Sequence, residues 1–525
     1  MECSCVRHTD VPGTSKIFAD LIYHFDRVED LYPYRPNSIE SLQAASSFEF
    51  PDARRAALVR ALTPLNQGNP SLRRLAEPGT VAIVTGQQVG LFSGPAYSVY
   101  KALTAIKAAS ELTLRGTPAV PVFWLATEDH DFAEVDHTWV FGADLQPVKL
   151  QAHAAGETGT RPVGGIGLED IPIEGLRQAL EGLPYASEAV AMVERAYKPG
   201  ETMGSSFARI IKELFEPYGL LLVDPMEPAL REIAAPLLRK AVERMPELSD
   251  ALMVRSKDLM ERGYHAQVLV DKSTSLVFLL QDGKRVALRR SDGGFTASHL
   301  KLTTEELAAR GVDLSPNALL RPVMQDYLLP TAAYIGGPAE LAYLAQSQVL
   351  YGCLLGRQPA AFPRAFFTLV DERSHKHMVR YGLNPKDLFA GEQALHDTIA
   401  RKLVPPALRA RLDSTQTAFT SAVDALKNDL NRFDVSLASA LDTSRRKIEY
   451  QIGKIARKTA SQIMARDAQA IRDARSLNGL AFPEKHLQER LYSIIPFIAK
   501  FGPGVVDELY SAVRIDCPDH QFVVV

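Results

Sequence analysis

The stretch TVAIVTGQQVGLFSGP, residues 80–95, joins a short apolar run to a turn rich in glycine and glutamine. The run from Thr80 to Thr85 is β-branched and uninterrupted, which is typical of a strand buried on both faces of a parallel sheet. After Pro95, apolar residues recur with a helical period until Gly116 and Pro118, which predict the end of a helix. The stretch therefore predicts a strand, a turn and a helix at the start of an α/β unit.

The same order of elements continues along the chain. AVPVFWLA, residues 119–126, predicts a second buried strand, so strand, helix and strand form a βαβ unit with a right-handed crossover. Residues 202–219 predict a helix and residues 220–225 another strand. Residues 328–346 then repeat the strand, glycine turn, proline and helix of the opening stretch. These patterns predict an α/β fold with a parallel sheet.

Two segments interrupt this alternation. Residues 151–200 predict a first connecting insertion of mixed structure, and residues 265–310 a second, β-rich insertion in which Asp282-Gly283 is a hairpin signal. The remaining pieces predict one core, which is formed by residues 1–150, 201–264 and 311–395 and is rejoined by a C-terminal segment, 477–525.

Residues 396–476 predict a helical coiled coil. Between Pro406 and Pro483 there is no proline, and apolar residues recur at spacings of three and four. One unbroken rod and an antiparallel hairpin of two helices both fit this pattern. The hairpin is favoured because Asp434 or Ser436 can cap a second helix.

The composition is that of an ordinary globular protein. The 525 residues carry a formal net charge of -3 and are 46% hydrophobic, which suggests neither a nucleic-acid nor a membrane partner. Charged residues interrupt the first twenty positions, and no apolar stretch reaches about 18 residues, so we expect a cytoplasmic protein. Four scattered cysteines do not predict a disulfide framework or a zinc site.

The opening turn is the first candidate site. A strand that feeds a glycine turn and then a helix directs backbone donors and the positive end of the helix dipole toward one point, where an anion can bind. The candidate ligand-binding residues here are Gly86, Gln87, Gln88, Gly94, Tyr97, Tyr100 and Lys101. The alternative is a tight turn whose glycines only supply positive φ.

The second candidate site is ATEDHDFAEVDH, residues 126–137, which gathers five carboxylates and two imidazoles. Because open parallel sheets bind ligands beyond the carboxyl ends of their strands, we expect this loop and the opening turn to share one pocket. If the segment is helical, His130, Glu134 and His137 lie on one face and could bind a metal or supply a general base. A solvated acidic helix start is the alternative, and no other cluster supports a metal.

The third candidate site lies in residues 314–340. It places Arg321, Gln325 and Asp326 before a predicted strand and Tyr334, Gly336, Gly337 and Glu340 after it. The functional interpretation is that the arginine grips a substrate carboxylate or phosphate, and the alternative is a structural ion pair.

Four stretches together resemble one known family over nearly the whole chain. They are VTGQQVGLFSGPAYSVYKALTAIK, PVFWLATEDHDFAEVDH, LSPNALLRPVMQDYLLPTAAYIGGPAELAYLAQ and LQER (residues 487–490). The family is the bacillithiol biosynthesis cysteine-adding enzymes, also named cysteine ligases. The resemblance implies a Rossmann-like core of nucleotidyltransferase type with two connecting insertions and a coiled coil that forms a homodimer. It also implies a ligase that joins cysteine to the amine of glucosaminyl malate in the last step of bacillithiol synthesis, with an adenine nucleotide such as ATP or ADP.

Carried onto this sequence, the resemblance suggests catalytic roles in the second loop. We expect His130 to move a proton or stabilise negative charge, Asp129 or Asp131 to orient it, and Glu128 to bind substrate. Arg321 and Glu340 would hold opposite ends of the cysteine zwitterion. The HDF stretch lacks the second histidine of an H-x-G-H turn, so adenylation at that point is not implied.

Two other functions fit the same sequence. One is a non-catalytic nucleotide-binding scaffold that recruits partners through its coiled coil, although the acidic loop argues against a decayed site. The other is a ligase that joins a different amino acid to an amino sugar.

Overall fold

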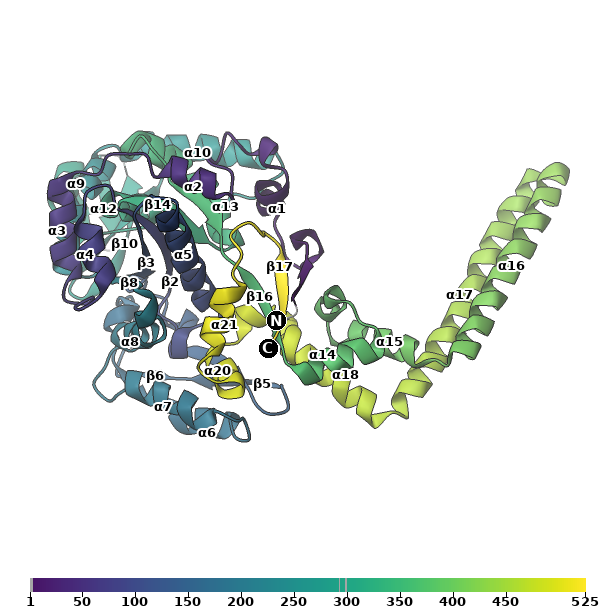
Figure 1. The fold of residues 1–525 in the computed structure, drawn as a ribbon. Coiled ribbons are helices and arrows are strands. Elements are labelled where there is room, and N and C mark those ends of the chain that lie inside the picture. The colour runs from purple at the N-terminus through teal and green to yellow at the C-terminus, as the bar shows by residue number, and fades with distance from the viewer. Residues whose placement is uncertain (1–2, 292, 298–299) are drawn as a thin grey trace.

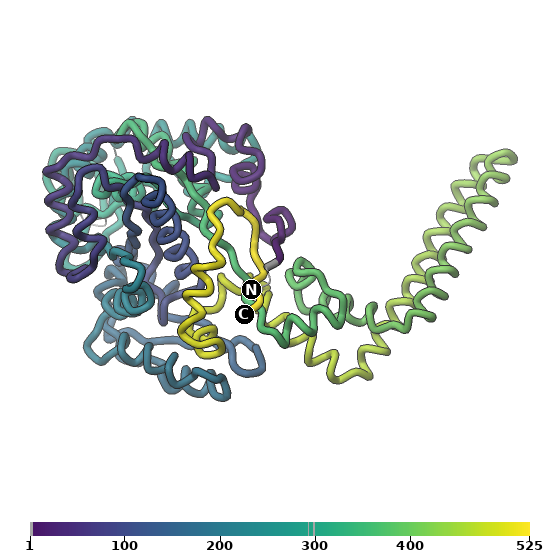
Figure 2. The backbone as a smooth tube through the Cα atoms, in the orientation of Figure 1, coloured from purple at the N-terminus to yellow at the C-terminus, as the bar shows by residue number. Residues whose placement is uncertain are grey.

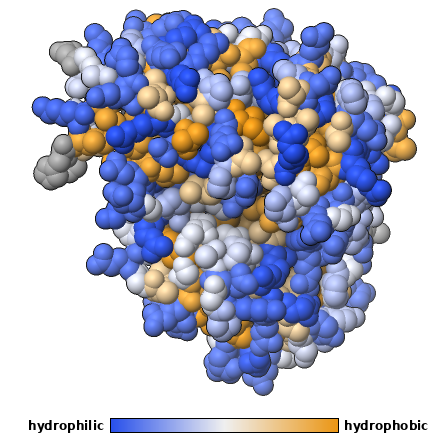
Figure 3. Space-filling model, turned by 90° about the vertical axis from the view of Figure 1, so that its left-hand side faces the viewer, coloured by the Kyte–Doolittle hydropathy of each residue, from blue (hydrophilic) through white to orange (hydrophobic). Residues whose placement is uncertain are grey.

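The fold was established from a computed structural model, which describes residues 3–291, 293–297 and 300–525. A compact core carries a long helical arm that projects to one side (Figure 1). Apolar and hydrophilic side chains are interspersed on the face of the core opposite the arm, as is usual for a surface in water (Figure 3). In the residues that the structure describes, no helix has the length and apolar character needed to cross a membrane.

The core is built on a five-stranded parallel sheet. Its strands in chain order are β2 (Val81–Gln87), β3 (Ala119–Leu125), β8 (Leu221–Val223), β14 (Thr331–Gly336) and β15 (Ala360–Pro363). The order in the sheet is β15-β14-β2-β3-β8, and every pair is parallel. After β2, the chain adds β3 and then β8 on one side of it, and it then adds β14 and β15 on the other side. This is the strand order of the Rossmann fold. The point where the direction reverses lies between β2 and β14.

Helices cover both faces of this sheet. On one face, α5 (Tyr97–Leu114) and α8 (Met203–Phe215) pack against Phe123, and on the other α9 (Pro228–Glu243) and α13 (Pro338–Leu354) pack near Trp124. The strand β3 is apolar throughout because its successive side chains meet helices on opposite sides of the sheet. The α/β fold with a parallel sheet is confirmed, whereas its assignment to the nucleotidyltransferase type stays a prediction.

The remaining helices of the core pack around these. Those before β2 are α1 (Lys16–Tyr23), α2 (Ile39–Ala45), α3 (Asp52–Leu62) and α4 (Pro70–Ala76). Those beyond β8 are α10 (Met245–Glu261), α11 (Thr304–Ala309) and α12 (Arg321–Leu328).

Both insertions contain antiparallel strands. Just before the first predicted insertion, β4 (His137–Phe141) pairs with β5 (Pro147–Gln151). The first insertion itself holds β6 (His153–Ala154) with β7 (Leu168–Asp170), and the helices α6 (Ile173–Ala179) and α7 (Ala186–Ala196). The second holds a sheet of order β12-β11-β10-β9-β13, with β9 (Thr274–Gln281), β10 (Lys284–Ser291), β11 (Gly294–Ala297), β12 (Leu300–Leu302) and β13 (Leu314–Pro316). The hairpin at Asp282 and Gly283 is confirmed, and their φ angles of 52° and 71° are those of a type I′ turn.

The arm is the predicted antiparallel hairpin. Its helices α16 (Pro406–Phe433) and α17 (Val435–Ala465) lie side by side along their length (Figures 1 and 2). Asp434 breaks the helix with a φ of -160° and caps α17, since its carboxylate accepts from the Ser436 amide at 2.7 Å. The prediction of two helices rather than one rod is confirmed. The base of the arm is formed by α14 (Glu372–Tyr381), α15 (Glu392–Leu403) and α18 (Ala468–Ala481).

The two ends of the chain meet in a small sheet beside the arm. The C-terminal strand β17 (His520–Val524) pairs in parallel with β16 (Phe366–Val370) and antiparallel with β1 (Cys3–Val6). Before it, α19 (Gln488–Leu491), α20 (Ile495–Phe501) and α21 (Val505–Ala512) lie against the core, where α21 contacts α5.

Candidate functional site

A cavity of about 720 Å³ opens at the carboxyl ends of β2, β3 and β14. Residues 86–88, 128–130 and 337–340 all contribute to its wall, so the three candidate stretches meet in one place. Gln88 Nε2 donates to Asp129 Oδ2 at 2.9 Å, which confirms that the opening turn and the acidic loop share a pocket. The cavity lies at the reversal point of the sheet, where open α/β folds bind their ligands.

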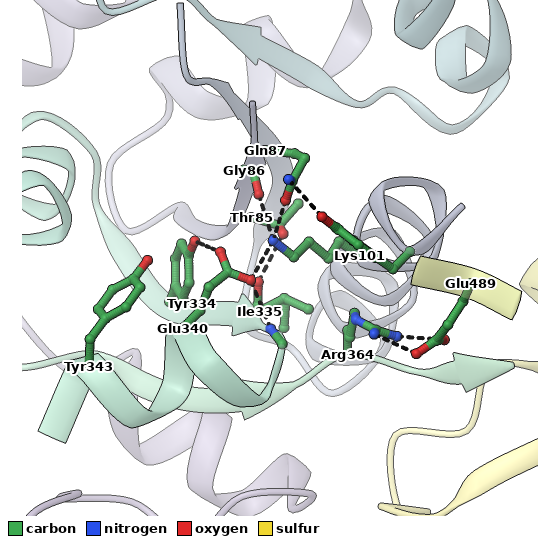
Figure 4. A network of polar contacts seen from close by, with 12 residues as sticks. Thr85, Gly86, Gln87, Lys101, Tyr334, Ile335, Glu340, Tyr343, Arg364 and Glu489 are labelled. Carbon is green, nitrogen blue, oxygen red and sulfur yellow. Dashed lines mark hydrogen bonds and ion pairs between the residues drawn. The ribbon is translucent and has the colours of Figure 1, made fainter. Parts of the chain in front are cut away.

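Lys101 is a buried cation that lines the cavity and lies within a network of polar contacts (Figure 4). Its Nζ, on the first turns of α5, donates to the Gly86 carbonyl and to Gln87 Oε1, both at 2.9 Å, and forms an ion pair with Glu340. Burial lowers the pKa of Lys101 to about 8, although the Glu340 carboxylate acts in the opposite direction. Because all three ammonium hydrogens have protein acceptors, Lys101 organises the wall.

Glu340 is the carboxylate that Lys101 holds. Tyr334 donates to it at 2.7 Å and the Gly337 amide at 2.9 Å, the latter as the capping contact of α13. Burial alone would raise the pKa of Glu340, but the Lys101 charge and these hydrogen bonds hold it below its ordinary value. Its side chain is 21% exposed and lines the cavity, so an ionised oxygen can accept from a substrate ammonium.

The glutamine of the same strand is oriented by the protein. Gln87 Oε1 accepts from Lys101, and its Nε2 donates to the Tyr97 hydroxyl at 3.1 Å. Gly86 allows the close approach of β2 and β3, because a Cβ there would lie 2.8 Å from the Trp124 carbonyl oxygen.

The acidic loop after β3 is not an α-helix. It contains a single 3₁₀ turn, Phe132–Glu134, and His137 already belongs to β4. The segment is therefore not the helix on which His130, Glu134 and His137 would share one face. The strand β4 pairs with β5, and this pairing takes His137 away from the cavity.

His130 faces the cavity beside a buried guanidinium. Its Nδ1 lies 3.3 Å from Arg285 Nη1 and 3.6 Å from Asp129 Oδ1. Since arginine only donates, Nδ1 is the acceptor and the proton of the neutral ring is on Nε2. Asp129 lies 3.5 Å from the same guanidinium, and its Oδ1 accepts from the His130 backbone amide at 2.7 Å. It therefore positions His130 through the backbone and through Arg285.

Glu128 is the buried member of the loop. Its Oε2 accepts from the Ser315 hydroxyl at 2.8 Å, and Arg285 Nε donates to that hydroxyl at 3.1 Å. Burial raises the pKa of Glu128. Within the described residues, Glu128 Oε1 has no hydrogen-bond partner.

Arg285 is a site residue that the sequence did not predict. It comes from β10 of the second insertion, stacks at 3.9 Å on the Phe278 ring and donates to the Pro316 carbonyl at 2.7 Å. The alternating pattern of a hairpin gives no sign that one arginine turns inward, so only the packing of the insertion on the core reveals it.

Arg321, the first residue of α12, also lines the cavity. It donates to Gln325 Oε1 at 3.3 Å and to the Tyr343 hydroxyl at 2.7 Å. In the part of the chain that the structure describes, no carboxylate forms an ion pair with Arg321. Its charge is therefore available to an anionic group.

Arg364 and Glu489 form a second feature that the sequence analysis missed. Two parallel hydrogen bonds of 2.8 and 2.6 Å join them, and both side chains are almost fully buried (Figure 4). Arg364 follows β15 directly, so the rule that ligands gather at carboxyl ends of strands could have identified it.

Six predicted site residues do not line the cavity. They are Gly94, Tyr100, Asp131, Gln325, Asp326 and Gly336. Tyr100 packs edge-on against Phe367 in the core, and Asp326 is buried with Tyr351 and has its pKa raised by that burial. Asp131 faces a separate shallow depression, and Gln325 accepts from Arg321 and donates to Asp326.

The expectation that the bare amides of the opening turn hold an anion is wrong for its second half. The Leu91 amide donates to the Val135 carbonyl, the Phe92 amide to the Tyr197 hydroxyl and the Gly94 amide to the Leu91 carbonyl. A Cβ at Gly90 would lie 2.8 Å from the Cα of Gly94, so these glycines serve close packing of the backbone. Only residues 86–88 of this turn reach the cavity.

The described residues do not form a group of side chains that could bind a metal ion. Among residues 3–291, 293–297 and 300–525, no group of three or more His, Cys, Asp and Glu side chains is arranged to hold a metal ion.

Comparison with known proteins assigns the whole chain to one family. Residues 1–365 match the family "Bacillithiol biosynthesis BshC, N-terminal Rossmann-like domain", and residues 367–525 match "Bacillithiol biosynthesis BshC, C-terminal coiled-coil domain". A relative from Solibacter usitatus, named "Putative cysteine ligase BshC", is 52% identical over 100% of both chains. Relatives of the same name from Koribacter versatilis and Salinibacter ruber are 39% and 30% identical and cover 99% and 97% of this chain, and 99% and 96% of their own. The chain therefore belongs to the bacillithiol biosynthesis BshC family, an enzyme family whose curated members carry the name of a ligase.

Proposed function

We propose that this enzyme joins the carboxyl group of cysteine to the amine of glucosaminyl malate in the last step of bacillithiol synthesis. The observation that carries the proposal is the charged cavity at the reversal point of the sheet, where an ionised carboxylate, Glu340, faces an unpaired guanidinium, Arg321. The family supports the choice of cysteine, since its members are named cysteine ligases. ATP and free cysteine are metabolites of the cytoplasm, where we place the reaction.

Glu340 and Arg321 suit the two charges of an amino acid. Glu340 accepts from the cysteine ammonium, and Arg321 donates to an oxygen of its carboxylate or of an attached phosphoryl group. Lys101 keeps Glu340 ionised and fixed.

An amide bond cannot form directly from a free carboxylate, so the carboxyl group needs activation. We propose that an adenine nucleotide supplies it. Arg321 supports this choice. In the described residues its guanidinium donates to the neutral side chains of Gln325 and Tyr343 and forms no ion pair, so its charge can bind a phosphate group of the nucleotide. His130, whose Nε2 carries the proton, then donates to the oxygen on which negative charge develops as the amine attacks, and Asp129 holds His130 in place through its backbone amide and through Arg285. The proton that the attacking amine releases passes to water.

The test is direct synthesis. Purified protein is incubated with cysteine, ATP and glucosaminyl malate, and the thiol product is identified by mass spectrometry. We expect the mass of the cysteine amide only with all three components. A product with another amino acid instead would change the substrate, and no product with any amino acid would reject a ligase reaction for this cavity.

A matched pair of variants tests the role of His130. We expect His130→Ala to lose most turnover with an unchanged thermal midpoint, whereas His153→Ala, whose side chain is 68% exposed, keeps it. Full turnover of His130→Ala would remove this residue from the mechanism.

A further inference from the structure

A second cavity of about 430 Å³ adjoins the central one. Both are lined by Pro338, Ala339, Arg364 and Arg490, so the start of α13 separates the two spaces only in part. We call the second cavity the annex. Its outer wall includes residues 12–15 and 485–487.

The annex carries more positive than negative charge. Lys485 and Arg490 line it and are exposed, and within the described residues neither forms an ion pair with a carboxylate. Glu489 also lines the annex, but its charge is balanced by Arg364. In the described residues, the surplus of positive charge in this cavity therefore has no carboxylate partner, and Arg490 has only the Tyr97 ring nearby, at 5.9 Å.

Arg364 adds an unused donor to this charge. The residue is 3% exposed, and its two terminal nitrogens bind Glu489. Among the described residues, its Nε has no hydrogen-bond acceptor. A buried N–H without a partner is costly, and a bound oxygen would satisfy it.

Features of the backbone also favour an anion in the annex. Pro338 and Ala339 are the first residues of α13, a helix of 17 residues whose positive dipole end faces both cavities. Glu484 and Lys485 hold left-handed φ angles of 48° and 62°, an unusual conformation for two successive side chains of this kind. This turn brings Lys485 to the annex.

We propose that the annex is a second subsite, which binds a carboxylate or phosphate group of a small anion between Lys485, Arg490 and the start of α13. Two sources supply this chemistry, and they are the dicarboxylate of a malate group and the pyrophosphate released from a nucleotide. The existence of the subsite follows from the charges and burial above. Its link to amide synthesis rests on the proposed function.

The test measures binding without turnover. Isothermal titration calorimetry of the full-length protein is done separately with L-malate and with pyrophosphate, at low and high salt. We expect saturable binding of one of them that weakens with salt. Either Lys485→Gln or Arg490→Gln weakens this binding about tenfold, as loss of a charge-assisted hydrogen bond implies. Lys257→Gln, which removes a 76% exposed lysine of α10, leaves it unchanged.

A further variant keeps the proposal open to refutation. If Arg321→Gln weakens the binding and the two annex variants do not, the anion binds in the central cavity and the subsite is rejected. Failure of both anions to bind also rejects it. Since no product is needed, a chain that makes no thiol can still confirm the subsite, and the two proposals fail separately.

Discussion

At the residue scale, Lys101 depends on three acceptors inside the protein. We expect Lys101→Met to leave Glu340 partly buried without its counter-charge, which costs roughly 3–5 kcal/mol in free energy of unfolding. Urea denaturation measures this loss, and product formation falls with it because Glu340 is no longer held ionised.

A double variant separates the charge from the packing. Lys101→Met combined with Glu340→Gln removes both charges, so it should recover part of the stability that the single variant loses. A single Lys101→Met variant as stable as the wild type would show that the ion pair is not needed.

At the scale of single elements, the end of β2 depends on Gly86. A Cβ at this position would lie 2.8 Å from a carbonyl oxygen of the neighbouring strand, so Gly86→Ala must push β2 and β3 apart. We expect a loss of roughly 1–3 kcal/mol in stability and a larger loss of turnover, because this end of β2 forms the cavity wall.

Gly352 in α13 is the matched control. Nothing lies within 4 Å of a Cβ built there, and its φ is not positive. Gly352→Ala should therefore raise stability by about 0.5–1 kcal/mol, as expected within a helix. Equal thermal midpoints for the two variants would contradict this account of Gly86.

At the scale of the whole molecule, the arm carries apolar side chains that its own two helices leave uncovered. Ile448 and Ile455 on α17 are 44% and 59% exposed. We predict that a second copy of the chain covers them in a homodimer, which Ile448→Lys with Ile455→Lys converts to a monomer in light scattering. Val254→Lys, at an exposed position of α10, should keep the dimer, and a monomeric wild type would reject the prediction.

Two buried histidines, which lie where the chain ends meet, predict that the protein loses stability in acid. Burial lowers the pKa of His8 and of His520 to about 3, so the folded chain keeps both neutral below the ordinary value of 6.5. Unfolding then takes up protons between about pH 6.5 and 3, and stability falls as the pH falls, by about 1.4 kcal/mol per pH unit for each histidine.

The test compares how steeply the free energy of unfolding changes with pH in the histidine variants. His8→Gln with His520→Gln should flatten the dependence of stability on pH in this range, whereas His153→Gln at the exposed position should not. An unchanged slope in the double variant would assign the acid limit to other groups.

The elements that the sequence predicts correctly are mostly those that follow from local patterns. The apolar runs at 80–85 and 119–126 predict buried parallel strands, and in the structure helices cover both faces of the sheet that these strands form. The heptads and Asp434 predict the hairpin of the arm because both are local signals. The site was predictable where it lies at strand ends, as for Gly86, Glu128 and Gly337. It was not predictable where long-range packing turned a side chain, as for Tyr100, which the sequence placed in the site and the structure places in the core.

The sequence by itself determined the parallel sheet, the helical hairpin and the strand-end loops that line the cavity. These features follow from periodicity and turn chemistry, which act between residues close in the chain. Only the tertiary structure decided that Lys101 faces Glu340, that Arg285 reaches His130 from another sheet and that Arg364 binds Glu489. Such pairs join residues more than a hundred positions apart, and their geometry depends on how buried charges are satisfied once the whole chain has packed.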